Sequence, residues 1–569
     1  MSSSTLWVTL AVVVLVDATL IAVLIFRHLK PLARRVLLAM AAVEVLLVVL
    51  HLTFRGQAKT FASWFFNLDL EFAGGALFSS AQYTAVALVA ALNALRASAS
   101  RIPQRLYWGA FTLLFAWLAL DEFFALHEGI LFWRGAYTIG GVAVVGMALL
   151  AYWLAFRGHT ELSVPLVVGL IMMGTSGVLL DAVTNDHVLV VAGVEMRWLL
   201  WFSCDGIIPV PCRYMNELSF SEEFLEMAGV SIVLASLISY TESTHGAEAR
   251  RGLRWAFAAA TSAWLIFFVG YLWIAPTIGS ALRARSAQVE YLDSDLALVG
   301  YFLSGDVLRP GDELTATLYF RANKPLDEDY RLAVQLIPRY GEEAIAQADF
   351  QLGEWQYPSS AWIPGLSVRN RVHLYIPQEV ITPQAYWLVA RVWHESRAVA
   401  LASADRQEVG PGSVVVADVV VLSDRAPLPP PIASDYRFEM GIHLVGYALP
   451  ESAASGGVLP LDFWWETERR VERELNQYVH LFDQVGTFAF GYDQAPFGGE
   501  SFPTTDWPAK MRERAHWDVP LPADLAPGVY EVYTGLYTLD DVVRLPVADA
   551  EGQPIPDFSI HLGAIRITK

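Results

Sequence analysis

Long apolar runs fill the first half of this chain and constrain its fold more than any other feature. A helix that crosses a membrane needs about 20 consecutive, mainly apolar residues. Such runs lie at residues 5–26, 33–54, 73–95, 106–128, 137–157, 163–184, 219–241 and 252–275. Only 17% of the 569 residues are charged, against about 25% in soluble proteins. The sequence therefore predicts an α-helical transmembrane bundle of about eight spans over residues 1–276.

Lysine and arginine in the short loops orient these spans. They concentrate in the first, third and seventh loops, at Arg27, Lys30, Arg34, Arg35, Arg96, Arg101, Arg105, Arg250, Arg251 and Arg254. Because such residues stay on the cytoplasmic side, the odd-numbered loops are expected to face the cytoplasm. The N-terminus, the C-terminus and all residues after Pro276 are then extracytoplasmic.

The second half contains a repeat with a period near 145 residues. Leu298-Val-Gly-Tyr301 recurs as Leu444-Val-Gly-Tyr447, and Arg371-Val-His373 recurs as Arg514-Ala-His516. Short alternating segments separated by Pro, Gly and Asp turns are typical of antiparallel β-sandwiches. The sequence predicts a linker at 277–296, a first β-sandwich module at 297–425, a Pro-rich linker at 426–434 and a second module at 435–569.

These modules resemble the C-terminal β-sandwiches of bacterial membrane glycosyltransferases. The resemblance lies in the Leu-Val-Gly-Tyr start, in Arg309-Pro-Gly-Asp312, in the segments around Trp362 and Trp507, and in Ala526-Pro-Gly-Val-Tyr530. It covers about half of the chain and implies an extracytoplasmic accessory module. Exposed aromatic residues would bind sugar there, although aromatic residues of a sandwich more often belong to its core.

Ionisable residues collect at the extracytoplasmic end of the predicted bundle. Leu120-Asp121-Glu122 is followed by His127-Glu128, and Glu222-Glu223 is followed by Glu226. Charges inside a span are costly, so they indicate a functional site. At about 100° per residue, Asp121 and Glu128 share one helix face, and Glu222 shares another with Glu226.

Several carboxylates lying together need a compensating cation. We predict that Asp121, His127, Glu128, Glu222 and Glu226 bind a divalent metal ion, with Glu122 and Glu223 as general bases. Carboxylate and imidazole ligands favour zinc, iron or manganese over calcium. The alternatives are a charged membrane interface that only orders the helix ends, a proton-handling site, and a haem between His51 and His127.

The two charged strings together resemble a group of uncharacterised bacterial polytopic membrane proteins. The residues that carry this resemblance are Leu120-Asp-Glu-x4-His-Glu128 and Glu222-Glu-x-Leu-Glu-Met227. The resemblance covers roughly the third to seventh spans and implies a multi-pass protein of the bacterial cell membrane. It implies no particular reaction.

Three functions remain open from the sequence. The first is a metal-dependent enzyme that acts on a lipid or a lipid-linked envelope substrate. The second is a non-catalytic subunit that binds an envelope protein or glycan through its sandwiches. The third is a lipid-linked sugar glycosyltransferase with Asp69 and Glu71 as its acidic pair. The net charge of −19 argues against a nucleic-acid partner. Cys204 and Cys212, the two cysteines, are expected to form a disulfide outside the cytoplasm.

Overall fold

A computed structural model describes most of the chain. It covers residues 25–54, 59–68, 70, 73–98, 102–124, 156, 158–174, 190–191, 194–195, 212–292, 295–341, 343–353, 357–499 and 502–569, with only the backbone at 190–191, 194–195, 212–222 and 247–249. The described chain divides into two compact units. Unit 1 takes in the chain up to Gly279 with Lys324–Asp329 and Leu352–Val368, and unit 2 takes in Ser280–Asn323, Tyr330–Gln351 and Arg369–Lys569.

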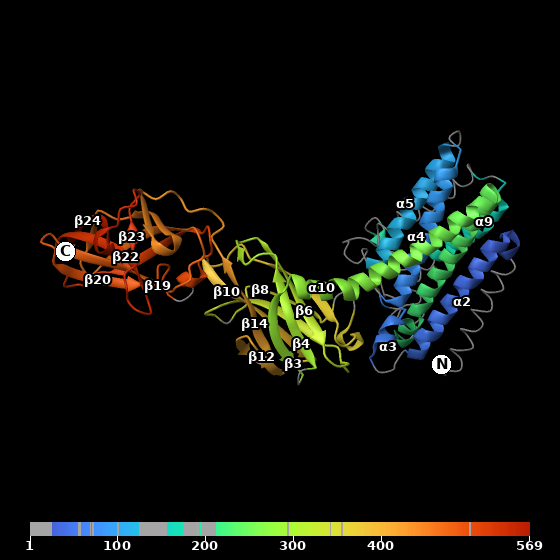
Figure 1. The fold of residues 1–569 in the computed structure, drawn as a ribbon, viewed down its shortest axis with the longest axis horizontal. Coiled ribbons are helices and arrows are strands. Elements are labelled where there is room, and N and C mark those ends of the chain that lie inside the picture. The colour runs from blue at the N-terminus through green and yellow to red at the C-terminus, as the bar shows by residue number, and fades with distance from the viewer. Residues whose placement is uncertain are drawn as a thin grey trace. The chain divides into compact units, whose positions relative to one another are not determined.

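Unit 1 is mainly helical. Its helices are η2 (Phe26–His28), α2 (Pro31–Phe54), α3 (Phe61–Phe65), α4 (Gly74–Arg96), α5 (Ile102–Phe124), α7 (Thr160–Gly174), α9 (Cys212–Val269) and the π-helical turn η6 (Gly270–Ile274), which continues into α10 (Ala275–Leu282). A short hairpin joins β1 (Val190–Val191) to β2 (Val194–Glu195). In Figure 1 helices α2, α4, α5 and α9 run alongside one another.

Five segments of the described chain are long and apolar enough to cross a membrane. They are Pro31–Phe54, Gly74–Arg96, Ile102–Phe124, Glu223–Gly246 and Arg250–Leu282. Gly246 divides the last two, because its φ of 61° interrupts the helical backbone of α9. These segments confirm the predicted spans at 33–54, 73–95, 219–241 and 252–275, and 106–128 as far as residue 124. The other three predicted spans lie wholly or partly outside the described residues, so a total of eight stays a prediction.

Small residues set how closely two of the helices pack. A side-chain carbon added to Gly169 of α7 would lie 2.7 Å from the Gly229 carbonyl oxygen of α9, and one added to Gly229 would lie 2.9 Å from the Gly169 carbonyl oxygen. The two backbones thus touch where neither residue has a side chain. Close contact between small residues is a main source of helix association in membranes, where the hydrophobic effect contributes little.

Two segments from the β-rich half belong to unit 1 with the helices. Trp64 of α3 lies 4.6 Å from Tyr357 between ring centroids. Lys59, just before α3, is 3.1 Å from Asp329 between Nζ and Oδ2. The segments Lys324–Asp329 and Leu352–Val368 therefore pack with the loop that carries α3.

The rest of the chain forms two pairs of mainly antiparallel sheets, in which β5 pairs with β14 and β17 pairs with β24 in parallel. In the first sheet pair the strand orders are β12-β3-β4-β6-β9 and β13-β14-β10-β7-β8. Two short strands extend the second of these sheets: β11 beside β10 and β5 beside β14. The strands are β3 (Arg285–Tyr291), β4 (Leu296–Leu303), β5 (Val307–Leu308), β6 (Glu313–Ala322), β7 (Arg331–Pro338), β8 (Ala346–Gln351), β9 (Ser367–Tyr375), β10 (Gln384–His394), β11 (Arg397–Ala398), β12 (Leu401–Ala404), β13 (Glu408–Gly410) and β14 (Ser413–Val421).

The second sheet pair has the orders β21-β18-β16-β15-β23 and β17-β24-β22-β19-β20. Its strands are β15 (Ile432–Phe438), β16 (Ile442–Ala448), β17 (Ser452–Ala454), β18 (Val458–Thr467), β19 (Leu475–Asp483), β20 (Phe488–Gln494), β21 (Arg512–Pro520), β22 (Gly528–Thr538), β23 (Val547–Ala548) and β24 (Ile560–Thr568). Buried and exposed residues alternate strictly along β21, as expected when one face of a sheet covers a core. That core contains Trp465, Trp507 and Trp517, each fully buried.

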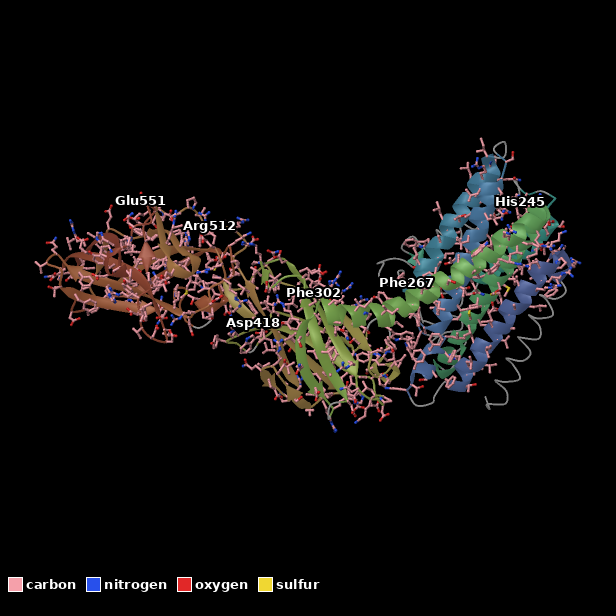
Figure 2. The ribbon with its side chains drawn as sticks, viewed as in Figure 1. His245, Phe267, Phe302, Asp418, Arg512 and Glu551 are labelled. Atoms are coloured by element: carbon pink, nitrogen blue, oxygen red, sulfur yellow. The ribbon has the colours of Figure 1, made fainter. Side chains whose placement is uncertain are left out.

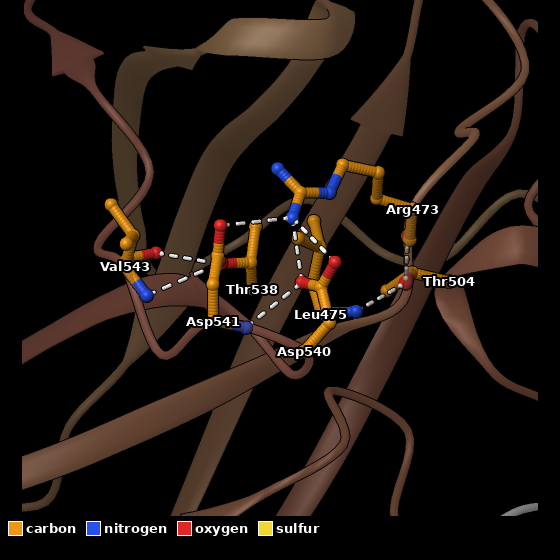
Figure 3. A network of polar contacts seen from close by, with 7 residues as sticks. All are labelled: Arg473, Leu475, Thr504, Thr538, Asp540, Asp541 and Val543. Carbon is orange, nitrogen blue, oxygen red and sulfur yellow. Dashed lines mark hydrogen bonds and ion pairs between the residues drawn. The ribbon is translucent and has the colours of Figure 1, made fainter.

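Short 3-10 helices sit in the connections of both sheet pairs. They are η7 (Ser359–Ala361), η8 (Glu439–Gly441), η9 (Thr504–Asp506) and η10 (Pro556–Phe558). In the second sheet pair, Arg473 also closes the loop after β22 by pairing with Asp540 and Asp541, at 2.6 and 3.3 Å (Figure 3). The Thr538 hydroxyl donates to Asp541 in the same network and, with Arg473, holds the pKa of that carboxyl below its usual value.

Candidate functional site

The structure places four of the predicted site side chains. Asp121 and Glu122 lie in the last turn of α5, and Glu223 and Glu226 lie in α9. The side chain of Asp121 is buried. Among the remaining predicted residues, His127, Glu128 and Cys204 lie outside the described residues, and Glu222 and Cys212 are described by their backbone alone. The disulfide between Cys204 and Cys212 therefore stays a prediction.

Three of these carboxylates gather around one tyrosine of α4. The Tyr83 hydroxyl donates a short hydrogen bond to Glu226 Oε1. Glu122 from α5 and Glu223 from α9 lie near enough to act electrostatically on the same hydroxyl. Tyr83 is only 2% exposed. The side chains from α4, α5 and α9 thus form what we call the Tyr83 cluster: Tyr83, Glu122, Glu223 and Glu226.

Packing around Tyr83 fixes the positions of these groups. The Tyr83 ring lies 5.8 Å from Phe115 of α5 between centroids. The same helix continues to Phe123, which contacts Trp264 of α9 at 4.6 Å. Trp264 in turn donates from Nε1 to Thr84 Oγ1 at 2.6 Å. Aromatic contacts between the helices therefore hold α4, α5 and α9 at the separation that brings the carboxylates to Tyr83.

The expected metal ligands do not form a complete set among the described residues. Within that part of the chain, no group of three or more His, Cys, Asp or Glu side chains is arranged to hold a metal ion. Three of the predicted ligands, His127, Glu128 and the Glu222 side chain, lie outside that part of the chain. The metal site therefore remains a hypothesis, and Asp121 and Glu226 are the predicted ligands whose side chains are described.

A second polar group joins helices α2, α4 and α9. Glu44 is 2% exposed, and its Oε1 accepts from Gln82 Nε2 at 2.9 Å and from Ser231 Oγ at 2.6 Å. Neighbouring helices thus satisfy this carboxyl group with neutral donors, as membrane proteins commonly do for polar residues inside a bundle. Glu44 therefore links α2 to α4 and α9 through hydrogen bonds.

His51 lies near the end of α2 and has a structural contact. Its Nδ1 accepts from the backbone N–H of Leu68 at 3.1 Å, and the side chain is buried. This bond fixes the loop between α3 and α4 to α2. The haem considered between His51 and His127 is untested, because His127 lies outside the described residues.

An apolar cavity of about 300 Å³ lies between α2, α4 and α9. Its lining residues are Met40, Val43, Leu47, Gly74, Leu77, Phe78, Ala81, Gln82, Ala85, Leu234, Phe257, Ala260, Thr261, Trp264 and Leu265. Gln82 and Thr261 are the polar members of this lining. Between helices of a membrane protein such a space is expected to hold hydrocarbon.

Comparisons with known proteins do not place the chain in a family. No family model matches it, and no curated protein matches it either. Among solved structures, the C-terminal domain of Wzt is 16% identical with a TM-score of 0.18, and the match covers 25% of this chain and 83% of that one. Transglutaminase of red sea bream is 9% identical with a TM-score of 0.16, covering 57% of this chain and 34% of that one.

A third solved structure, β-glucuronidase of Bacteroides uniformis, is 10% identical with a TM-score of 0.14 and covers 41% of this chain and 26% of that one. This chain therefore spans about a quarter to a third of the length of the two enzymes. Likenesses at these scores carry no argument about function. The resemblances drawn from sequence strings also stay predictions.

Proposed function

We propose that this protein is an integral membrane enzyme that uses a divalent metal ion, bound beside the Tyr83 cluster with Glu226 as a shared residue, to act on a lipid or a lipid-linked envelope substrate. The observation that carries the proposal is the convergence of Glu122, Glu223 and Glu226 on the buried Tyr83 hydroxyl. These carboxylates are half-buried, and carboxylates that gather around one hydroxyl repel one another unless a cation or a shared proton compensates them.

A metal ion there would polarise an oxygen of a lipid head group or activate a water molecule. The proposed ligands are Asp121, His127, Glu128, Glu222 and Glu226, and zinc, iron and manganese are the candidate ions. Glu122 and Glu223 are the proposed general bases. The Tyr83 hydroxyl adds a donor that orients Glu226 from the side of α4. A partner that holds a metal ligand in one orientation commonly changes metal affinity by about 10–100-fold.

The proposed topology brings this site to the extracytoplasmic side of a bacterial cell membrane. Positive loops orient the spans so that both termini lie outside. The two sheet pairs are then extracytoplasmic modules, and we propose that they are tandem copies. Two observations support this view. Corresponding strands follow the same order in both sheet pairs, and the matched sequence segments lie about 145 residues apart.

The alternative is a non-catalytic envelope or membrane-complex subunit that binds a protein or glycan through its sheet pairs. In that case the Tyr83 cluster only links α4 to α5 and α9. The two functions differ in whether the purified protein carries a metal ion. The third candidate, a glycosyltransferase, rests on Asp69 and Glu71, which lie outside the described residues.

Metal analysis of the full chain in lipid nanodiscs tests the proposal. We expect a stoichiometric transition metal in the wild type and at least a ten-fold loss of affinity in Glu226→Gln, because the variant removes a ligand charge. Tyr83→Phe should weaken binding by about ten-fold through the lost orienting bond.

Glu242→Gln is the matched control. Glu242 lies in the same helix α9, has a side chain only 8% exposed, and pairs with Arg250 at 3.0 Å. Its substitution should leave the metal content unchanged. A wild-type protein without metal would refute the proposal, as would an equal loss in Glu226→Gln and Glu242→Gln.

A further inference from the structure

One face of the second sheet pair carries an unusual set of side chains. The face belongs to the sheet β17-β24-β22-β19-β20, of which Figure 1 labels β24, β22, β19 and β20. Along β19 the residues Val479 and Leu481 are buried, whereas His480 between them and Phe482 after them are only partly buried. Because side chains alternate along a strand, His480 and Phe482 point away from the core.

Pairing between strands places more rings beside these two. His480 is in register with Tyr533 of β22, and Tyr533 is in register with His561 of β24. On the other side, Phe482 is in register with Phe488 of β20. We call these five side chains, His480, Phe482, Phe488, Tyr533 and His561, the aromatic face.

The five rings form a continuous chain of contacts across four strands. Between ring centroids, His480 is 5.3 Å from Phe488, Phe488 is 5.7 Å from Phe482, Phe482 is 5.5 Å from Tyr533, and Tyr533 is 4.9 Å from His561. The first three contacts are edge-to-face. This arrangement suits the quadrupoles of the rings and holds them in fixed orientations.

A glycine completes the packing of this surface. Gly491 of β20 is in register with His480. A side-chain carbon added at Gly491 would come within 3.0 Å of both the His480 ring and the Phe488 ring. The His480 and Phe488 rings therefore occupy the space over Gly491 that a side chain would otherwise fill.

Two of the five rings are open to solvent, and the other three are partly buried. Phe488 is 55% exposed, and the His561 side chain is 50% exposed. Leaving large apolar rings in water forgoes the free energy of their burial. Contiguous exposed apolar surface edged by polar groups commonly marks a binding site.

Carboxylates stand beside the rings. Asp493 Oδ1 lies 3.5 Å from His480 Nε2, and Glu531 Oε2 lies 2.6 Å from His561 Nε2. Both carboxylates are substantially exposed, so oxygen atoms remain accessible to a ligand. Burial lowers the pKa of His480, so its ring is expected to be neutral at pH 7 and to act as a flat, uncharged surface.

One end of the face is closed. The Tyr478 ring lies 4.5 Å from His480, and the Arg544 guanidinium covers it at 5.0 Å. The Tyr478 hydroxyl bonds to Ser559 at 3.0 Å. The loop that carries Arg544 follows the Asp540 and Asp541 network of Figure 3. A ligand on the aromatic face would therefore extend from this closed end toward Phe488 and His561.

We propose that the aromatic face binds a carbohydrate chain. A pyranose ring presents polarised C–H groups on one side, which lie favourably on the negative face of an aromatic ring. Its hydroxyl groups point outward at the edge, where Asp493 and Glu531 accept hydrogen bonds that are stronger for being charge-assisted. Flat rings edged by acceptors thus match the two surfaces of a sugar.

A protein partner fits these observations less well. Strand addition would use the free edge of β20 and its backbone groups, whereas the exposed rings lie on the face of the sheet. A basic peptide would be attracted to the carboxylates of Asp493 and Glu531, but binding of such a peptide would not require five adjoining aromatic rings. The proposal does not depend on the metal site in the helices.

A glycan array probed with the full chain in lipid nanodiscs tests the proposal. The array should carry neutral and amino-sugar oligosaccharides from two to six residues long. We expect selective binding, and a loss of affinity of about ten-fold in Phe488→Ala, the amount that corresponds to one aromatic contact. Phe488→Trp should retain binding, because it preserves a ring in the same place.

Phe302→Ala is the matched control, since Phe302 of β4 is 47% exposed and lies in the first sheet pair (Figure 2). It should bind as the wild type does. Unfolding temperatures equal to that of the wild type would show that Phe488→Ala remains folded. Absence of any oligosaccharide binding by the wild type overturns the proposal, and so does equal binding by Phe488→Ala and Phe302→Ala.

Discussion

The two sheet pairs share a plan of strands but differ in the charges that they bury. In η7 of the first pair, the Ser359 hydroxyl donates to the Glu328 carbonyl at 3.0 Å. In η9 of the second, the Thr504 hydroxyl donates to the Arg473 carbonyl at 2.8 Å. The last residue of the helix is Ala361 in the first pair and Asp506 in the second. The hydrogen bond to a backbone carbonyl is thus common to both sheet pairs, whereas the buried charge of Asp506 occurs only in the second.

A contact of Asp506 joins the two sheet pairs within unit 2. Arg339 after β7 holds Asp506 with two bonds, Nη1 to Oδ2 at 2.7 Å and Nη2 to Oδ1 at 3.1 Å. Arg339 Nη2 also reaches Asp418 at 2.9 Å. Asp506 is 4% exposed, and burial raises the pKa of its carboxyl group although Arg339 opposes this change. The difference shows that a buried ion pair here serves to fix two modules together rather than to stabilise either one.

The largest predicted effect comes from breaking this ion pair. Arg339→Ala leaves Asp506 buried without its charged partner, and such changes cost up to about 3–5 kcal/mol. The raised pKa of Asp506 limits the loss, because the carboxyl group takes up a proton more readily than an exposed one. Thermal unfolding of the full chain, followed by tryptophan fluorescence, measures the change.

Two variants make the result specific to the contact between sheet pairs. Arg391→Ala removes an exposed arginine from neighbouring β10 and should change the unfolding temperature little. The double variant Arg339→Met/Asp506→Leu should recover much of the loss, because an apolar pair replaces the ionic one. A fully additive loss in the double variant would contradict this account.

A smaller effect should separate the corresponding tryptophans, Trp362 and Trp507. Both are buried, but Trp362 Nε1 donates to the Tyr357 carbonyl at 3.1 Å, whereas Trp507 Nε1 has no partner among the described residues. Both Trp→Phe changes remove similar volume. Trp362→Phe also removes the hydrogen bond that Trp362 donates to the Tyr357 carbonyl. It should therefore lower the free energy of unfolding by about 1–2 kcal/mol more than Trp507→Phe does. Denaturant unfolding of the two variants compares them, and equal losses would show that the bond at Trp362 contributes nothing.

Much of the fold followed from the sequence because its signals are local. Apolar runs predicted five of the helices that can cross a membrane, and turn residues between alternating segments predicted a β-rich second half. The Tyr83 cluster was predicted in part. The spacing of Glu222 and Glu226 predicted that these two share one face of a helix, but a tyrosine inside an apolar run gives no sign that it binds a carboxylate. The rotation of α4 against α9 decides that, and packing rather than sequence spacing sets it.

The contact between the sheet pairs left no signal in the sequence. Arg339 and Asp506 lie 167 positions apart, and each is an ordinary surface residue by its neighbours in the chain. The sequence matches between the two sheet pairs even hide this contact, because Asp506 aligns with Ala361. Asn370 and Glu513, which directly precede the matched Arg-x-His segments, likewise align a neutral residue of the first sheet pair with a charged residue of the second.

Glu513 should give the smallest effect, and it depends on pH. Glu513 is 2% exposed and accepts from the Ser423 backbone N–H at 2.9 Å and hydroxyl at 2.6 Å. Burial raises the pKa of its carboxyl group above the ordinary value, although the bonds from Ser423 and the charge of Arg309 oppose this. Folding thus favours the protonated form. The stability that this group contributes is present at low pH and is lost as pH rises through the raised pKa.

Glu513→Gln should therefore stabilise the protein relative to the wild type at pH 7 and make little difference near pH 4. The expected gain at pH 7 is a few degrees in unfolding temperature, since ~1 kcal/mol shifts a unit of this size by about 2–4 °C. Comparing the variant with the wild type at each pH cancels the effect of all other titrating groups. A difference that stays constant from pH 4 to pH 7 would mean that the pKa of Glu513 is the same in the folded and the unfolded protein. The neighbours of Glu513 would then compensate the burial of its charge, and the second sheet pair would bury a carboxylate where the first has Asn370 at no cost in stability.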